Sequence, residues 1–150
     1  MEVHDQSDRS ISIRPCAPED SSVLIAGRDI ESHRFLGVGA THPMPAFCII
    51  VSGEVVGWVD FDTGGPWLLP GEVNIGYNVF PPHRQRGYAS CAARLLFTHL
   101  AQNTHYTVAT LLINRDNQAS LRVARRLNCQ QQPDLDGNAY FKMELTHQQP

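Results

Sequence analysis

The 150-residue sequence has no apolar run that approaches the roughly 18 residues needed to cross a membrane, so we expect no membrane partner. It also contains no internal repeat and no low-complexity segment. Its first ten residues are acidic and lack an apolar core, and we therefore expect no secretory signal. These absences, with 42% hydrophobic and 18% charged residues, favour an ordinary globular protein in the cytoplasm.

The cysteines lack the close spacing of a metal site. They are far apart in the chain, no C-x-x-C pair occurs, and the four positions are Cys16, Cys48, Cys91 and Cys129. This pattern favours reduced thiols over a disulfide framework or a zinc site. We accordingly expect no bound metal.

Positive charge is scarce except in one region. Residues 1–83 hold four arginines against eleven acidic residues, whereas residues 84–126 hold seven arginines against Asp116 alone. A positive middle on a protein of net charge −3 suits a compact polyanion better than a nucleic acid, which favours a broadly basic surface. We expect no nucleic-acid partner.

The pattern of apolar residues predicts an α/β chain with alternating elements. Strands are expected at 11–15, 47–51, 55–61, 72–79, 107–113 and 138–145, with a tight turn at 52–54. One or two short helices are expected between 18 and 36, capped at Asp20 or Ser21, and longer ones from 88 and from a cap at Asp116 or Asn117. The length predicts a single domain over 1–150, with 1–10 as a flexible tail.

The stretch from 72 to 89 carries the most chemistry. Its strand places Glu72, Asn74, Gly76 and Asn78 on one face, a polar row that we expect to line a cavity. Pro81-Pro82 ends the strand, and Arg84-Gln85-Arg86-Gly87-Tyr88-Ala89 leads into an amphipathic helix. Backbone N–H groups at such a turn bind phosphate, and Arg84 and Arg86 would add charge; an ordinary connection with solvated arginines is the alternative.

Two motifs in this order resemble the GNAT acetyltransferases. Arg84-x-x-Gly87-x-Ala89 is similar to the family's acyl-CoA signature. The segment Asn117-Gln118-Ala119-Ser120, continued by Leu121-Arg122-Val123-Ala124, resembles the second motif of the ribosomal-protein N-terminal acetyltransferase (RimJ/RimL-type) branch. The resemblance implies a mixed, twisted sheet of six to seven strands with about four flanking helices. It also implies that the fourth and fifth strands splay apart.

The resemblance also implies roles for individual residues. The pantetheine arm of acetyl-CoA would pair with the backbone of Tyr77, Asn78 and Val79, and the pyrophosphate would lie on Arg84, Gln85, Arg86, Gly87, Tyr88 and Ala89. Asn117 would bond the arm and Ser120 would protonate the departing sulfur, although helix capping alone explains both residue types.

The sequence departs from the family in the groups that act on the acceptor. The glutamate that commonly activates the amine falls on Asn74, an amide that takes no proton at neutral pH. Glu72 or Asp60 would then act through water, or the amine would arrive neutral. A family tyrosine falls on Ala124, and Asn128-Cys129 replaces the usual Gly-Phe, with Asn128 able to adopt the left-handed cap conformation.

These residues favour an acetyl-CoA-dependent N-acetyltransferase that transfers directly to an amine, in a monomer or homodimer. The acceptor would be a peptide, a protein N-terminus or a small molecule, with His33 and His42 as candidate neighbours. An acyl-CoA-binding sensor without turnover is the alternative. A nucleotide-binding module is disfavoured because the chain lacks the Gly-Lys-Ser/Thr of a P-loop and the second glycine of a Rossmann turn.

Overall fold

A computed structural model describes residues 3–4 and 11–146. The described residues form two compact units. Unit 1 contains those up to Asp60 together with Tyr77–Leu95, and unit 2 contains Phe61–Gly76 together with those from Leu96 onward. The other residues of the expected N-terminal tail lie outside the described part of the chain. The expectation of one domain over the whole chain stays a prediction.

Unit 1 is built on antiparallel strands. Strands β1 (Val3–His4), β2 (Ile11–Pro15), β3 (Phe47–Val51) and β4 (Glu54–Asp62) pair in that order. The end of β5 (Glu72–Val79) lies next to β4. The short strand β1 falls in the segment that we expected to be a tail. The other three strands agree with the sequence pattern.

A two-residue turn joins β3 to β4. Ser52 and Gly53 both have positive φ, at 50° and 81°, between the paired residues Val51 and Glu54. Two positive φ values are typical of the type I′ turn, whose twist matches that of the flanking strands. The hairpin predicted at 52–54 is therefore confirmed.

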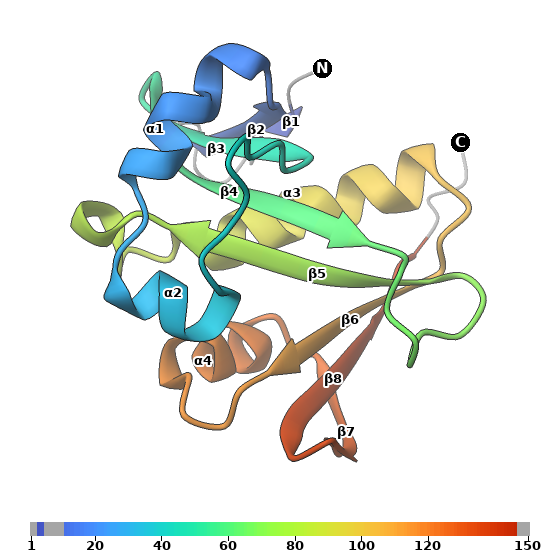
Figure 1. Ribbon diagram of the computed structural model, residues 1–150. Helices are drawn as coiled ribbons and strands as arrows, with labels where there is room; N and C mark the ends of the chain where they lie inside the picture. The colour runs from blue at the N-terminus through green and yellow to red at the C-terminus, as the bar shows by residue number, and fades with distance from the viewer. Residues whose placement is uncertain (1–2, 5–10, 147–150) are drawn as a thin grey trace. The chain divides into compact units, whose positions relative to one another are not determined.

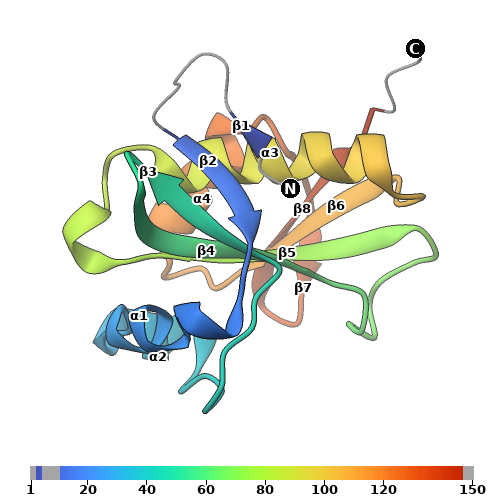
Figure 2. The ribbon, with the colours of Figure 1, turned by 90° about the horizontal axis from the view of Figure 1, so that it is seen from above.

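Helices cover both faces of the β2–β4 sheet. A 3-10 turn, η1 (Pro18–Asp20), and the short helices α1 (Ser21–Ala26) and α2 (Ile30–Leu36) lie on one face, and the start of α3 (Tyr88–Asn103) lies on the other (Figure 2). Asp20 occupies the N-cap position of α1, one of the two positions predicted for the cap, but its side chain makes no capping bond to that helix. Its carboxylate instead accepts bonds from Arg14 and from the Ala17 N–H.

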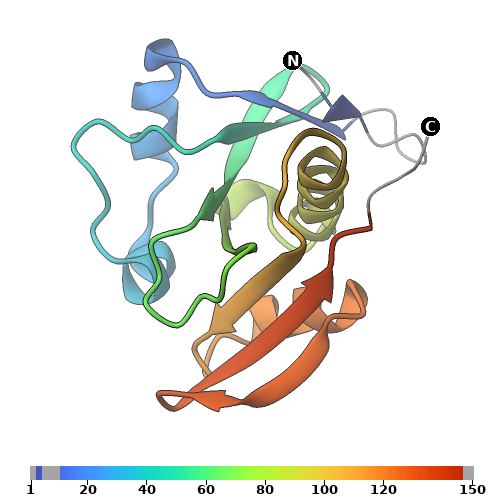
Figure 3. The same cartoon turned by 90° about the vertical axis from the view of Figure 1, so that its right-hand side faces the viewer.

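Unit 2 contains the remaining strands (Figure 1). The start of β5 runs parallel to β6 (Val108–Ile113) and pairs with it. Strand β6 pairs with β8 (Asn138–Glu144), and β8 pairs with β7 (Gln130–Leu135); both of these pairings are antiparallel. Helix α4 (Gln118–Arg126) lies against one face of β6 and β8 (Figure 3). The sequence analysis did not predict β7.

The pairing between β5 and β6 is short. It covers three residue pairs and ends at Asn74 and Thr110, although both strands continue beyond that point. The predicted splay of the fourth and fifth long strands is confirmed by this early end. No described helix combines the length and the apolar character that a membrane span requires.

The two faces of the sheet in unit 2 differ in polarity. Residues on one face are apolar and almost fully buried, namely Val73, Ala109, Leu111, Ile113, Ala139 and Phe141. The register places polar side chains on the opposite face, namely Glu72, Asn74, Thr110, Tyr140 and Lys142. The alternation follows from the two-residue period of a strand. Only the second face carries candidate chemistry.

The end of α4 confirms the role expected of Asn128. Its φ is 58°, and the N–H groups of Asn128 and Cys129 donate to the carbonyls of Arg125 and Ala124. This is the Schellman arrangement, which usually has glycine at the left-handed position. Asparagine tolerates that conformation better than other non-glycine residues.

Gly57 sets the distance between β4 and β5 in unit 1. A Cβ atom at this position would lie 2.2 Å from the Asn78 carbonyl oxygen and 2.9 Å from the Val79 Cα. Both neighbours are backbone, so neither can rotate away.

We therefore expect Gly57→Ala to lower the free energy of unfolding by about 1–3 kcal/mol, the usual range for overpacking. Chemical denaturation measures this change. Gly64→Ala is the matched control, since its nearest added contact is a flexible Asp62 side-chain oxygen at 3.3 Å. Equal losses in the two variants would contradict a backbone clash at Gly57.

Candidate functional site

The loop after β5 presents backbone N–H groups at the start of α3. The turn η2 (Pro81–His83) is followed by a bond from the Arg84 N–H to the Pro81 carbonyl, and the Cys91 N–H donates to the Gly87 carbonyl. Between these bonds the chain turns twice through positive φ, at Gln85 (62°) and Gly87 (81°). Alternating backbone handedness of this kind forms a concave nest of N–H groups, and the helix dipole adds partial positive charge.

Gln85 is the more informative of the two turn residues. Glycine reaches positive φ readily, but a glutamine there is strained and has to be held by its surroundings. Gln85 and Arg86 are exposed, and Gly87, Tyr88 and Ala89 are partly exposed. The predicted phosphate-binding stretch therefore has the backbone shape and the access that an anion site requires.

Arg84 holds this loop to two other elements of unit 1. Its Nε donates to the Val79 carbonyl at 2.8 Å, and its Nη1 lies 2.7 Å from an Asp29 carboxylate oxygen and 2.9 Å from one of Glu31. Its Nη2 also donates to the Asn78 side chain at 3.3 Å. The guanidinium lowers the pKa of Asp29 to about 2.

These contacts change how we interpret the arginines of the motif. The Arg84 charge is directed at two carboxylates of α2 and its cap, whereas the sequence analysis had assigned it to phosphate. Arg86 is exposed and stays the candidate for that charge. The Asn78 side chain is buried and accepts the hydrogen bond from Arg84, so it points toward protein atoms and away from solvent. Tyr77 and Val79 are the other residues at the end of β5.

The polar row of β5 is largely satisfied by neighbouring strands in unit 2. Asn74 accepts a hydrogen bond from the Thr110 hydroxyl at 3.1 Å. Glu72 is buried, with one carboxylate oxygen 2.7 Å from the Lys142 Nζ and the other accepting the Leu69 N–H at 3.0 Å. We expected this row to line a cavity, but Thr110 lies against Asn74, and Lys142 and the Leu69 N–H lie against Glu72.

This geometry disfavours Glu72 as a general base. Both of its oxygens already accept hydrogen bonds, one from the Leu69 N–H and the other from the Lys142 ammonium. The same contact raises the pKa of Lys142. Asp60, the other candidate carboxylate, accepts the Ala46 N–H at 3.0 Å in unit 1. His33 and His42 are exposed.

Tyr140 is a polar residue of this face that the sequence analysis missed. Its side chain is on β8 next to Lys142, whose Nζ lies 5.8 Å from the ring centroid. Among the described residues its buried hydroxyl makes no hydrogen bond of good geometry, and burial raises its pKa while a contact with Thr110 lowers it in part. A buried unpaired hydroxyl is rare in folded proteins. The alternation of Ala139, Tyr140 and Phe141 in a strand was the signal that could have placed it.

The second predicted motif forms the first turn of α4. Asn117 is the N-cap, and its side-chain oxygen accepts the Ser120 N–H at 3.2 Å. The capping function that we had considered as the alternative is therefore present. Ser120 is partly exposed, and Ala124 is fully buried, so the position of the family tyrosine serves the core of unit 2.

Most of the chain matches one protein-family model. A family model described as an acetyltransferase (GNAT) domain matches residues 11–130. Among curated proteins, no sequence matches the chain.

Solved structures give the same result for the fold. A GNAT-family acetyltransferase from Bacillus anthracis is 16% identical, with a TM-score of 0.78 over 96% of this chain and 98% of that one. RimL, a ribosomal L7/L12 α-N-protein acetyltransferase in complex with coenzyme A, is 16% identical, with a TM-score of 0.72 over 94% and 97% of the two chains. RimJ of Mycobacterium smegmatis is 15% identical, with a TM-score of 0.72 over 96% and 86%.

The buried ion pair in unit 2 can be tested by removing either partner. Lys142→Met leaves the Glu72 carboxylate buried with a single donor. We expect a loss of about 2–3 kcal/mol in the free energy of unfolding, below the range for fully buried pairs because Lys142 is partly exposed.

The double variant Glu72→Gln/Lys142→Met should recover most of this loss, since no unpaired charge is then buried. Denaturant titration of the wild type, the two single variants Glu72→Gln and Lys142→Met, and the double variant forms a complete double-mutant cycle. Additive losses would mean that the two side chains do not interact.

Proposed function

Because the chain belongs to the GNAT acetyltransferase family, we propose that it transfers the acetyl group of acetyl-CoA directly to the amine of an acceptor. Both substrates would be bound together, so that no acetyl group is attached to the enzyme. Such a transfer needs acetyl-CoA bound in a fixed position and an acceptor amine that is neutral. It also needs hydrogen-bond donors for the developing oxyanion and a proton for the departing sulfur.

The observation that supports this proposal most strongly is the backbone of the loop before α3. Positive φ at Gln85 and Gly87 orients consecutive N–H groups as a diphosphate would require. In this proposal Arg86 adds charge. Arg84 acts by fixing the loop through Asp29 and the Val79 carbonyl, rather than by touching the phosphates.

Other residues would serve the acyl end of the coenzyme. The backbone of Tyr77, Asn78 and Val79 would run along the pantetheine arm, with the Val79 N–H as the donor to the thioester oxygen. The Asn117 side-chain oxygen caps α4, and its amide N–H₂ group would still donate to the arm. The Ser120 hydroxyl would give a proton to the departing sulfur.

We propose that the amine reaches the enzyme already neutral. Glu72 is held by Lys142 and the Leu69 N–H, and Asn74 takes no proton, so neither of these two residues of the polar row is positioned as a base. An α-amine, with a pKa of about 7.7–8.0, is roughly one-third neutral at pH 7.5, whereas a lysine side chain is neutral in only roughly one molecule in a thousand. This difference favours an α-amine acceptor.

The acceptor that fits best is therefore the N-terminus of a peptide or protein. RimL is described as acting on an α-amino group of a ribosomal protein. In unit 1, α2 and the loop that follows it expose apolar side chains, namely Ile30, Leu36, Val38 and Met44. Such side chains would suit the apolar part of a peptide better than a small charged amine. We further propose a monomer or homodimer that acts in the cytoplasm.

A sensor that binds acyl-CoA without turnover is the second candidate. The replacement of the usual glutamate by Asn74, together with the paired state of Glu72, is the observation that favours it. Binding of coenzyme without transfer to any acceptor would distinguish it from the enzyme.

Coenzyme binding should depend on the loop geometry. We expect Gly87→Ala to weaken CoA binding by roughly tenfold or more, because a side chain at φ 81° strains the nest. Arg86→Ala should weaken the binding of CoA more than it weakens the binding of a pantetheine analogue that lacks the phosphates.

Isothermal titration calorimetry measures both effects, with Arg94→Ala, an exposed arginine of α3 outside the loop, as a matched control. Wild-type protein that fails to bind CoA at millimolar concentration would refute the proposed function. Equal losses in Arg86→Ala and Arg94→Ala would refute the phosphate role alone.

Acetyl transfer should depend on the basicity of the acceptor. With N-terminal peptides we expect kcat/KM to rise with pH and to level off near pH 8, as the α-amine loses its proton. Release of CoA thiol from acetyl-CoA measures the rate across peptides, lysine derivatives and small amines. A rate that levels off near pH 6 would instead indicate a base supplied by the enzyme.

A further inference from the structure

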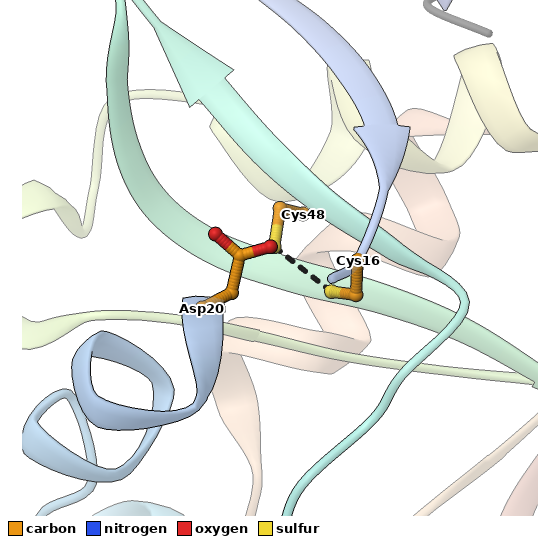
Figure 4. Close-up of side chains that lie close together, drawn as sticks. All are labelled: Cys16, Asp20 and Cys48. Carbon is orange, nitrogen blue, oxygen red and sulfur yellow. Dashed lines mark hydrogen bonds between the residues drawn. The ribbon is translucent and has the colours of Figure 1, made fainter. Parts of the chain in front are cut away.

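Two cysteines far apart in the sequence lie together in unit 1. Cys16 follows β2 and Cys48 is in β3, and their sulfur atoms are 2.8 Å apart (Figure 4). Arg14 pairs with Cys48 across the two strands, which places Cys16, two residues further on, diagonally opposite Cys48 on the same face. This arrangement brings the thiols within reach of a covalent bond with little movement of the backbone.

The two thiols differ in exposure. Cys48 is fully buried and packs with Leu24 of α1 and with Phe80. Cys16 is partly exposed. A reagent in solvent therefore reaches Cys16 first, and Cys48 is the nearest nucleophile that can complete a reaction begun there.

Asp20 lies beside the two sulfurs, so a metal ion has to be considered. One atom from each of the three side chains falls within 4.8 Å of the others. However, both Asp20 oxygens are 2.8 Å from the Arg14 guanidinium, and one also accepts the Ala17 N–H at 2.8 Å. A guanidinium in this place opposes a divalent cation, and three ligands are one fewer than a structural zinc site uses.

From this geometry we propose that Cys16 and Cys48 form a reversible disulfide when the protein meets a peroxide. The Cys16 thiolate attacks one peroxide oxygen, which yields a sulfenic acid and releases water or an alcohol. Cys48 then attacks the Cys16 sulfur, the sulfenic oxygen leaves as water, and an S–S bond forms. One peroxide is reduced as two thiols are oxidised, and a reducing thiol reverses the reaction.

The surroundings of Cys16 favour the first step. A hydrogen bond from Cys48 lowers the pKa of Cys16, and Arg14 acts in the same direction, against burial and the charge of Asp20. Thiolates near an arginine are the reactive form of cysteine. Cys129 provides a contrast within the chain, because burial raises its pKa to about 11.

The bond would constrain the segment that holds the loop before α3. It would join residues 32 apart in the chain, which enclose α1 and α2. The α2 cap Asp29 binds Arg84, and Gly27 packs so closely on Phe80 that a Cβ there would lie 2.2 Å from the ring. Oxidation would thus restrain the same elements that fix Arg84. The proposal does not depend on the acetyl acceptor.

Peptide mapping by mass spectrometry tests it directly. Folded protein treated with a few equivalents of hydrogen peroxide should yield a Cys16–Cys48 linked peptide that dithiothreitol removes. Two thiols per chain should be lost together, and the thermal midpoint should rise by several degrees, since the link restricts the unfolded chain.

Cys16→Ser should abolish the linked peptide and the rise, whereas Cys129→Ser should retain both. Cys48→Ala serves as a second variant, in which Cys16 should stop at the sulfenic or sulfinic acid. A sulfinic acid on wild-type Cys16 without a cross-link, or cross-links to other cysteines, would overturn the proposal. So would stoichiometric zinc in the purified wild type that is lost on Cys16→Ser.

Discussion

The Arg84 guanidinium is the contact on which the arrangement of unit 1 depends. It joins the last carbonyl of β5, the cap of α2 and the loop that leads into α3. Two carboxylates compensate its charge and hold it in place, while Gln85 stays exposed and Gly87 partly exposed. The first arginine of the acyl-CoA motif thus has a structural reason to be there, because it fixes a strained turn.

Unit 2 makes the opposite use of charge. The buried carboxylate of Glu72 pairs with the Lys142 ammonium, and both of its oxygens accept hydrogen bonds. The Asn74 side chain is hydrogen-bonded to Thr110. The side chains of Glu72 and Asn74 are thereby held in place by partners within unit 2. In the proposed reaction the amine would therefore have to lose its proton before it binds, which favours an acceptor amine of low pKa.

The sequence predicted the fold and the positions of both motifs, because apolar periodicity and the glycine at 87 are local signals. Strand β7 was missed since Gln130, Gln131 and Gln132 carry no alternation, although Asp136-Gly137 before β8 is a strong hairpin signal. The charged partners of Arg84 and Glu72 and the thiol partner of Cys16 could not be predicted, because each of these partners lies more than 30 residues away in the chain. Sequence shows which charges exist, and only the fold shows which neutralise each other.

The pairing of Lys142 has one more consequence. It is the sole lysine in the sequence, and its amine is kept protonated by Glu72. An enzyme that handles a reactive thioester risks modifying its own side chains, and a protonated amine has no lone pair with which to attack. The chain therefore offers its own donor no lysine nucleophile, and repeated turnover should leave that side chain unacetylated.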